Sequence, residues 1–295
     1  MLKKIRYEEL FPHEMEEIMK EKPIAYLPFG TFEWHSLHLA LGIDAVKVHE
    51  ICLRVAEKAG GIVVPATYWA AGGMPHPWTT RFDTSFIEKL FYEIFSQMDH
   101  VGFKVVIAIT GHYGLEQLYA LKKAACDYMY KSNLIIIPMP EYEVAYEKGY
   151  LGEHAAKWET SLLWAVRPEL VDMSLLGKNL EKIPDGVMGA DPRLHASRQL
   201  GEETVNHIVD RLSKMSHRLL HGTNSLDRSR LIRALNLQVK ILEKAMKTPM
   251  EELSLTPQIR TEEYKSFIDN LWRGNYVEAI EKGEGIFISA REVKK

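Results

Sequence analysis

Acidic and imidazole side chains crowd the segment directly after the apolar run 24–29. Glu33, His35, His38 and Asp44 all fall within residues 30–44. In extended chain Glu33 and His35 project to the same side because they stand two positions apart, and Asp44 returns from the following turn or helix. These are ligand types that a divalent cation accepts. The segment predicts half of a metal site, the alternative being a polar loop with solvated carboxylates.

A second group of residues follows the apolar run 104–109. The chain there reads Thr110-Gly111-His112-Tyr113-Gly114, and the glycines permit a tight turn. A histidine at such a strand end could complete the site begun by Glu33, His35 and Asp44. The alternative for His112 is a helix-start residue that hydrogen-bonds to the backbone.

The third group is Glu153 and His154, followed by Glu159 at the start of a helix over 160–166. A carboxylate beside an imidazole can serve as general base and then general acid next to a metal-activated water. For Glu159, a metal ligand and a residue that complements the helix dipole are equally compatible with the sequence. Glu141 and Glu143 favour a solvated strand end rather than a carboxylate pair.

The segment 72–83 combines Gly, Pro, Trp and Arg and is the most individual part of the chain. His76, Trp78 and Arg81 predict a substrate loop that provides a donor, a wall and a cation. A guanidinium group matches carboxylate, keto or hydroxyl oxygens in a fork. The alternative is a rigid surface loop held by its prolines.

These residues need a scaffold that places strand ends side by side. Short apolar runs alternate with stretches of helical spacing, which predicts right-handed crossovers and a mostly parallel sheet covered on both faces. The expected fold is a three-layer α/β/α sandwich with a helical C-terminal extension, divided into 1–222 and 223–295. Expected strands are 24–29, 61–66, 104–110 and 134–139, with a further one at 285–289; expected helices are 46–59, 84–100, 114–131, 201–220, 226–246 and 262–282, and 184–193 is an irregular loop.

Composition limits the classes of function. The chain has 295 residues, 46% of them hydrophobic, a net charge of -3 and no basic stripe, so nucleic acid is an improbable partner and a small molecule is favoured. No apolar run is long enough to span a membrane and no signal-peptide pattern follows the N-terminus, which predicts a cytoplasmic protein. The cysteines Cys52 and Cys126 lack partners at zinc or redox spacing and read as buried free thiols.

Together, the three groups resemble the creatininase (creatinine amidohydrolase) family. The resemblance rests on the following residues, with 186–192 as a further shared loop: Gly30, Glu33, His35, His38 and Asp44; Gly111 to Tyr113; Glu153, His154 and Glu159 to Ser161. It implies a metallohydrolase, usually a homo-oligomer and often a hexamer, with one or two divalent ions, commonly Zn²⁺, Mn²⁺ or Fe²⁺.

The resemblance also implies roles for individual residues. Glu33 and His35 would bind different ions, Asp44 would bridge them and His112 would be a further ligand. Glu153 and His154 would form the catalytic pair. Independently of the resemblance, we expect His38 and Tyr113 to orient the ligands, and Tyr113 also to contact the substrate. One position departs from the pattern: Gly114 stands where creatinine-hydrolysing members carry a ligand Glu. Glu159 is the preferred replacement and Glu116 the second choice.

The expected function is a metal-dependent hydrolase that cleaves an amide-type C–N bond of a small cyclic substrate. The departure at Gly114 makes creatinine itself an unfavoured substrate. The close alternative is hydrolysis of a C–C bond in a cyclic polyhydroxy ketone of inositol or carbohydrate catabolism, such as a dehydro-inosose. A non-catalytic metal- or ligand-binding protein on the same scaffold is the second alternative, which the presence of Glu153 and His154 disfavours.

Overall fold

The sheet at the centre of the molecule is parallel and four-stranded. The computed structural model describes residues 4–181, 186–222, 224–247 and 261–292. Its strands are β1 (Ile24–Phe29), β2 (Ile62–Val63), β3 (Val105–Thr110) and β4 (Ile135–Pro140), in the order β2-β1-β3-β4. All of their residues are buried, as expected of strands covered on both faces. The carboxyl ends of β1, β3 and β4 therefore lie side by side.

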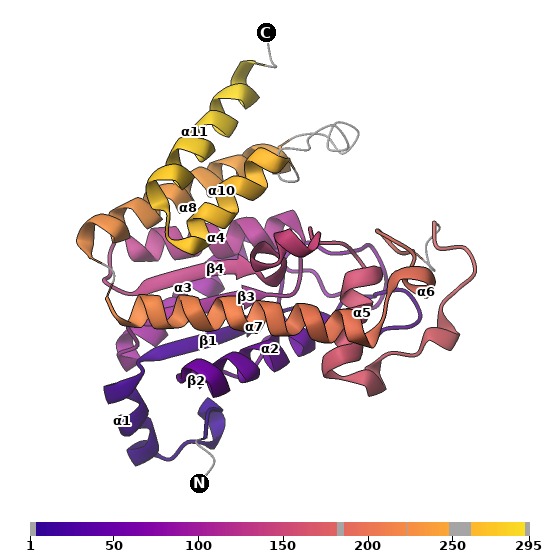
Figure 1. The fold of residues 1–295 in the computed structure, drawn as a ribbon, viewed down its shortest axis with the longest axis horizontal. Helices are drawn as coiled ribbons and strands as arrows, with labels where there is room; N and C mark the ends of the chain where they lie inside the picture. The colour runs from indigo at the N-terminus through magenta and orange to yellow at the C-terminus, as the bar shows by residue number, and fades with distance from the viewer. Residues whose placement is uncertain (1–3, 182–185, 223, 248–260, 293–295) are drawn as a thin grey trace.

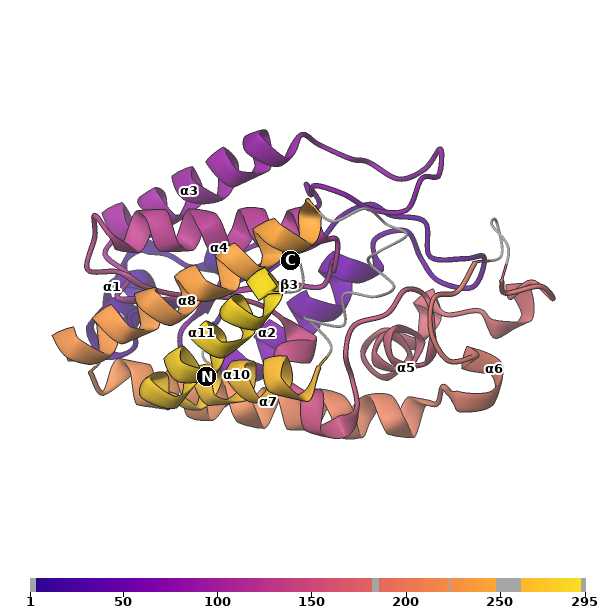
Figure 2. The same ribbon diagram turned by 90° about the horizontal axis from the view of Figure 1, so that it is seen from above.

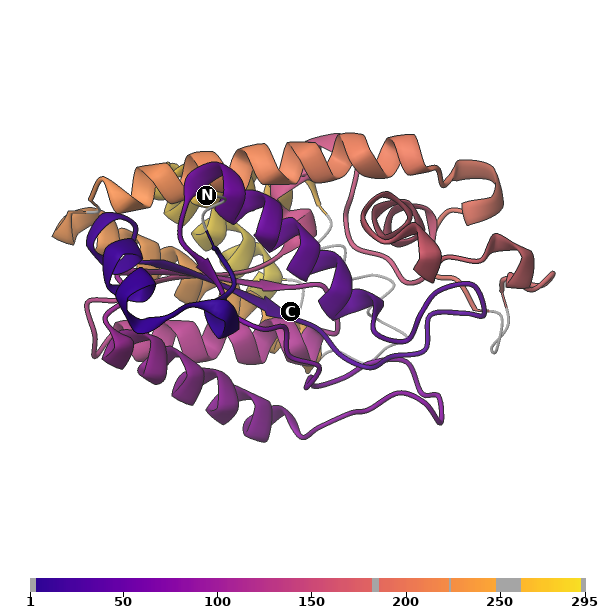
Figure 3. The same cartoon turned by 90° about the horizontal axis from the view of Figure 1, so that it is seen from below.

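Helices cover both faces of this sheet, which confirms the three-layer expectation. On one side lie α3 (Thr84–Val101) and α4 (Leu115–Met129), and on the other α2 (Ile43–Ala59) and α7 (Arg198–Leu220) (Figures 2 and 3). The shorter α5 (Lys157–Val166) and α6 (Pro192–His195) stand beyond the strand ends, and α1 (Pro12–Glu21) lies near the β2 edge (Figure 1). The short turns are η1 (Tyr7–Glu9), η2 (Glu141–Val144), η3 (Tyr146–Lys148), η4 (Pro168–Leu170) and η5 (Met173–Leu175).

The C-terminal helices lie beyond β4, at the end of the sheet opposite α1 (Figure 1). They are α8 (Ser225–Met246), α10 (Glu262–Arg273) and α11 (Tyr276–Glu292), and α8 packs along α4. The helical extension is thus confirmed. Its separation at residue 222 as a domain of its own stays a prediction.

Two sequence expectations for this extension were wrong. The single helix expected over 262–282 is broken at Gly274, which ends α10 with a positive φ of 88°. A residue with a side chain adopts this backbone conformation only with strain. The strand expected at 285–289 lies inside α11. A short apolar run is ambiguous between strand and helix, and packing of Gly283 against Leu237 and Phe267 favours the helix here.

Elsewhere the differences concern element ends. The strand expected over 61–66 is only two residues long, and most helices begin or end one to three residues away from their expected bounds. The loop expected over 184–193 lies partly outside the described residues and ends in α6. Both cysteines are buried and free, as expected. Within the described residues, no helix is long and apolar enough to cross a membrane.

Two glycines without side chains allow the start of α2 to approach the ends of β1 and β3 closely. A Cβ added at Gly30 would lie 2.1 Å from the backbone nitrogen of Ala45, and one added at Gly111 would lie 2.1 Å from the carbonyl oxygen of Asp44. Neither approach is possible for a residue with a side chain. This close contact places Asp44, in the first turn of α2, between the two strand ends.

We expect Gly111→Ala to lower the free energy of unfolding by about 3 kcal/mol, the upper range for overpacking, because the blocking atom is backbone. Urea unfolding monitored by circular dichroism measures this. Gly285→Ala is the matched control. No atom of the described residues lies within 4 Å of its added Cβ and the residue is exposed in a helix, so stability should rise by about 0.5 kcal/mol or more. Equal midpoints for Gly111→Ala and the unaltered protein would contradict the close contact.

Candidate metal centre

Side chains from all three sequence groups converge at the carboxyl ends of the sheet. They come from the loop after β1, the first turn of α2, the loop after β3, and the segment that enters α5. All of them are at most 8% exposed. The converging residues are Glu33, His35, Asp44, His112, His154 and Glu159.

One donor group consists of Glu33, Asp44 and His112. Nδ1 of His112 lies 2.9 Å from Oε2 of Glu33 and 3.3 Å from Oδ2 of Asp44. The ring is fixed on its other side, where Nε2 lies 3.1 Å from the carbonyl oxygen of Ala71. Such a contact to a backbone carbonyl orients an imidazole so that its free nitrogen faces a cation.

A second donor group consists of His35, Asp44 and Glu159. Nε2 of His35 lies 3.3 Å from Oδ1 of Asp44 and 3.4 Å from Oε2 of Glu159. Nδ1 of His35 lies 3.1 Å from the carbonyl oxygen of Glu33, which fixes this ring as well. Asp44 therefore presents one oxygen to each group, and Glu159 reaches the group from the first turn of α5. Glu116, the second choice from sequence, lies beside Gly72 and outside both groups.

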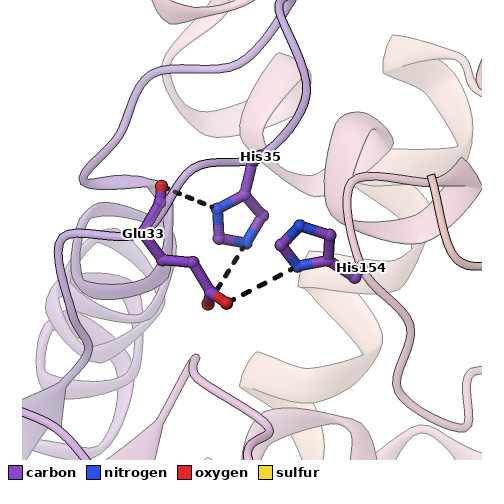
Figure 4. A group of neighbouring side chains, drawn as sticks. All are labelled: Glu33, His35 and His154. Carbon is purple, nitrogen blue, oxygen red and sulfur yellow. Dashed lines mark hydrogen bonds and ion pairs between the residues drawn. The ribbon is translucent and has the colours of Figure 1, made fainter. Parts of the chain in front are cut away.

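His154 lies next to His35 and Glu33 (Figure 4). Its ring centroid lies 4.3 Å from that of His35, and its Nδ1 lies 4.0 Å from Oε1 of Glu33. Its Nε2 is buried and has no hydrogen-bond partner in the described part of the chain. Glu33, His35 and His154 form a third group with metal-ligand spacing, so geometry alone permits His154 either to bind an ion or to handle protons.

Glu153 is held by the start of α5. Its Oε1 accepts hydrogen bonds from the backbone N–H groups of Trp158 and Glu159, the latter at 3.1 Å. Burial and repulsion from the Glu159 carboxylate raise the pKa of Glu153 to about 8. The side chain lines the same pocket as the two donor groups.

The backbone is strained beside both central histidines. Ser36, which follows His35, has φ of 57°, and Ala155, which follows His154, has φ of 54°. The left-handed backbone conformation costs a residue with a side chain about 1–2 kcal/mol of conformational free energy. The backbone N–H of Ala155 donates to Oε2 of Glu159 at 2.8 Å, so the strained turn helps to fix a candidate ligand.

Lys47 is a residue of the site that the sequence did not single out. It is fully buried, and its Nζ hydrogen-bonds to Oε1 of Glu159 and lies 3.7 Å from Oδ1 of Asp44 and 3.5 Å from Oε1 of Glu141. A signal was available: Lys47 stands one helical turn after Asp44, on a helix whose neighbouring positions Val48 and Ile51 are core residues. A charged residue there must have a partner.

The expectation for Glu141 and Glu143 was wrong, because both carboxylates are buried. Strand β4 ends against helices and not in solvent, so η2 carries them inward. Glu141 accepts a hydrogen bond from the hydroxyl of Tyr113 and lies 3.4 Å from that of Tyr150. Glu143 is bound by the C-terminal helices and is treated below.

The donor groups form the floor of a pocket of about 260 Å³. Its other walls are mostly apolar, with contributions from Met74, Leu115, Leu118, Leu151 and Met188, next to the rings of Tyr113 and Tyr142. Tyr113 is therefore at the pocket, as expected.

The other residues predicted to bind substrate do not line this pocket. Trp78 is 65% exposed, Arg81 is also exposed, and His76 stacks on Trp34 with ring centroids 4.9 Å apart. His38 lies behind the site, where its Nε2 is 2.9 Å from the Thr160 hydroxyl.

The charged groups of the site shift one another's pKa values. Burial alone would raise the pKa of Glu33, but attraction to His112 and His35 outweighs it and lowers that pKa to about 2. For His112 the balance is the reverse: burial opposes the charge, yet Glu33 and Asp44 raise the pKa to about 10. Burial and the nearby His35 lower the pKa of His154 to about 4. Protons on buried imidazoles thus neutralise the carboxylates, a role that a divalent cation takes over when it displaces them.

The residues present fit such a cation. Both carboxylate oxygens of Asp44 are buried without a hydrogen-bond partner among the described residues, which is costly unless something else satisfies them. The mixed nitrogen and oxygen donors suit Zn²⁺, Mn²⁺ or Fe²⁺.

Comparison with known proteins identifies relatives. A family model described as creatininase, creatinine amidohydrolase, matches residues 8–216. The creatinine amidohydrolase of Pseudomonas putida is 25% identical over 173 residues, which cover 51% of this chain and 66% of that protein, just under two thirds of its length.

Solved structures show the same fold. A creatinine amidohydrolase (creatininase) structure has a TM-score of 0.65 and 20% identity and covers 74% of this chain and 99% of its own. A creatininase described as a Mn form has a TM-score of 0.58 and 23% identity, with 71% and 96% covered. A mutant creatininase of Zn-Zn type has the same score and identity, with 71% and 95% covered.

Proposed function

Because the chain belongs to the creatininase family, whose model it matches over residues 8–216, we propose that it is a divalent-metal-dependent hydrolase of a small cyclic substrate. The reaction is hydrolysis of an amide-type C–N bond. The observation that carries this proposal is the buried Asp44, whose two oxygens face two different donor groups and have no hydrogen-bond partner among the described residues.

In this proposal each donor group would hold one ion. Glu33 and His112 would serve the first ion, His35 and Glu159 the second, and Asp44 would be shared by both. Glu159 takes the place of the ligand missing at Gly114, and its preference over Glu116 is supported by its contact with His35 at 3.4 Å. When bound, the ions supply positive charge that polarises an amide carbonyl and makes water acidic enough to deprotonate near neutral pH.

The protein's own groups handle protons and orient the ligands. His154 has a lowered pKa and is neutral near pH 7, so its unpartnered Nε2 can accept a proton and later donate it to the leaving nitrogen. Glu153, buried beside it, is the second member of the pair. Lys47 holds one oxygen of Glu159 and leaves the other for the ion.

We propose two bound ions. Zn²⁺ is the preferred metal, and Mn²⁺ and Fe²⁺ are the alternatives. Relatives described as Mn and Zn-Zn forms support the first two. The donor set accepts all three ions, so identity must be measured.

The apolar pocket walls favour amide hydrolysis over the alternative reaction on a cyclic polyhydroxy ketone. Such a ring would bring several hydroxyl groups against Leu115, Leu118 and Leu151, which offer them no hydrogen-bond partner. The ketone reaction remains the second candidate because the same metal-ligand set would serve it. The roles of His76, Trp78 and Arg81 as substrate-binding residues remain a prediction, and oligomerisation and a cytoplasmic location remain predictions too.

The test is metal analysis of protein purified without chelator, followed by a screen of cyclic amides and inositol-derived ketones. We expect tightly bound transition metal and hydrolysis of a cyclic amide to a free amine or to a ring-opened product that carries both the new carboxylate and the nitrogen. A ring-opened keto acid without nitrogen would favour the alternative reaction. Protein that holds no transition metal and turns over neither class would revive the non-catalytic alternative.

A further inference from the structure

The four-residue turn η2 connects the candidate site with the C-terminal helices. It follows β4, and its acidic side chains contact different parts of the molecule. Glu141 contacts Lys47 and Tyr113 at the site, whereas Glu143 contacts α4, α8 and α10. Tyr142 between them lines the pocket.

Glu143 is held by a complete set of buried donors. Its oxygens accept hydrogen bonds from Nζ of Lys122 at 3.1 Å, Nε2 of Gln238 at 2.8 Å and Nε1 of Trp272 at 2.7 Å. All of these residues are at most 2% exposed. A buried carboxylate is costly unless it is paired and hydrogen-bonded, and removal of one partner exposes that cost. The position of Glu143, and with it that of η2, therefore depends on the donors from α8 and α10 as well as on Lys122 of α4.

The other side of η2 reaches the site at two points. Glu141 lies 3.5 Å from Nζ of Lys47, which in turn holds Glu159. The Tyr142 ring packs edge-on against Tyr113, with centroids 5.0 Å apart, and so closely against Gly152 that an added Cβ there would lie 2.8 Å from the ring. Gly152 directly precedes Glu153 and His154. A shift of η2 would thus move a pocket wall, the lysine that holds a ligand, and the catalytic pair.

The donors from α8 and α10 lie outside the part of the chain that the family model matches, which ends at residue 216. Buried polar groups are not needed to pack η2 against α8 and α10, because apolar residues such as Leu235, Phe267 and Leu271 already pack these helices.

Resting on the proposed function, we infer that Gln238 and Trp272 are positioning residues of the hydrolase site. They hold Glu143, and through η2 they set the position of Lys47 and therefore of Glu159. The C-terminal helices are in this sense part of the metal centre, although none of their described residues belongs to a donor group.

The test is a Zn²⁺ titration of the full-length, metal-stripped protein against a chromophoric chelator, with thermal unfolding of each variant measured in parallel. Trp272→Phe keeps a ring beside Lys122 but removes the N–H that Glu143 accepts. Removal of groups that orient metal ligands costs about 10–100-fold in metal affinity, and because Trp272 acts through further residues we expect the lower value, a rise of about tenfold in the Zn²⁺ dissociation constant.

Ile268→Ala is the matched control. Ile268 is fully buried in the same helix, and the substitution costs as much stability or more by cavity formation, but no polar contact joins it to Glu143. We expect its Zn²⁺ dissociation constant to stay near that of the unaltered protein. In a Glu143→Gln background, Trp272→Phe should add little, because the two act through one contact. Gln238→Met, which removes the other donor, replaces this cycle if Glu143→Gln does not fold.

Unchanged affinity in Trp272→Phe and Gln238→Met, or an equal loss in Ile268→Ala, would overturn the inference and leave the proposed function standing. If Asp44 of the unaltered protein took no part in Zn²⁺ binding, both the inference and the proposed function would be overturned.

Discussion

Asp44→Ala is expected to remove tightly bound metal and activity together. Asp44 is the one candidate ligand shared by both donor groups, with Oδ1 3.3 Å from His35 and Oδ2 3.3 Å from His112. Loss of a group that only orients ligands costs about 10–100-fold in metal affinity, so loss of the shared ligand should exceed that range. Metal content by elemental mass spectrometry and turnover of the substrate found in the screen measure the effect.

The control for this variant is Asp210→Ala. Asp210 is an exposed carboxylate that pairs with Lys58 on the surface, so its loss should leave metal content unchanged and stability within about 1 kcal/mol. Full metal content and full turnover in Asp44→Ala would show that the proposed site is wrong.

Glu159→Gln is expected to remove one ion and keep the other. The amide leaves Lys47 without its hydrogen-bonded carboxylate and gives the group of His35 and Asp44 one negative charge less. Glu33 and His112 pair with each other and share no donor group with Glu159, so the first ion should stay bound. Metal content should fall to about one equivalent and turnover to a few per cent or less, since a two-metal site uses both ions.

Glu116→Gln is the matched control, because Glu116 was the other candidate for the missing ligand. It lies beside Gly72, away from the donor groups, so both metal content and turnover should match those of the unaltered protein. The reverse result, with loss in Glu116→Gln and none in Glu159→Gln, would exchange the roles of the two residues.

The sequence predicted well where one local pattern decides the structure. The run Ile24–Phe29 is a strand to the residue, because an apolar run of that length between polar flanks can be buried on both faces. It predicted poorly where tertiary contacts decide, as at 285–289, which lies in the helix α11 whose Gly283 packs on Leu237 and Phe267. The break at Gly274 was readable in principle, since glycine commonly ends helices.

For the site, the sequence indicated the types of residue and their position at strand ends, but not which further charged side chains are buried there. Glu33, His35, Asp44 and His112 are brought together because parallel strands end at one edge. Lys47 and Glu141 were not predicted as parts of the site, since their burial depends on how α2, β4 and α5 meet. The segment 72–83 drew attention by composition, yet its His76 and Trp78 lie outside the pocket.

The most direct test of the proposed metal centre is an anomalous-scattering map from crystals of the protein loaded with Zn²⁺. We expect two peaks about 3.5–4 Å apart, one among Glu33, Asp44 and His112 and the other among His35, Asp44 and Glu159. Peaks elsewhere in the chain, or none at Asp44, would contradict the proposed centre.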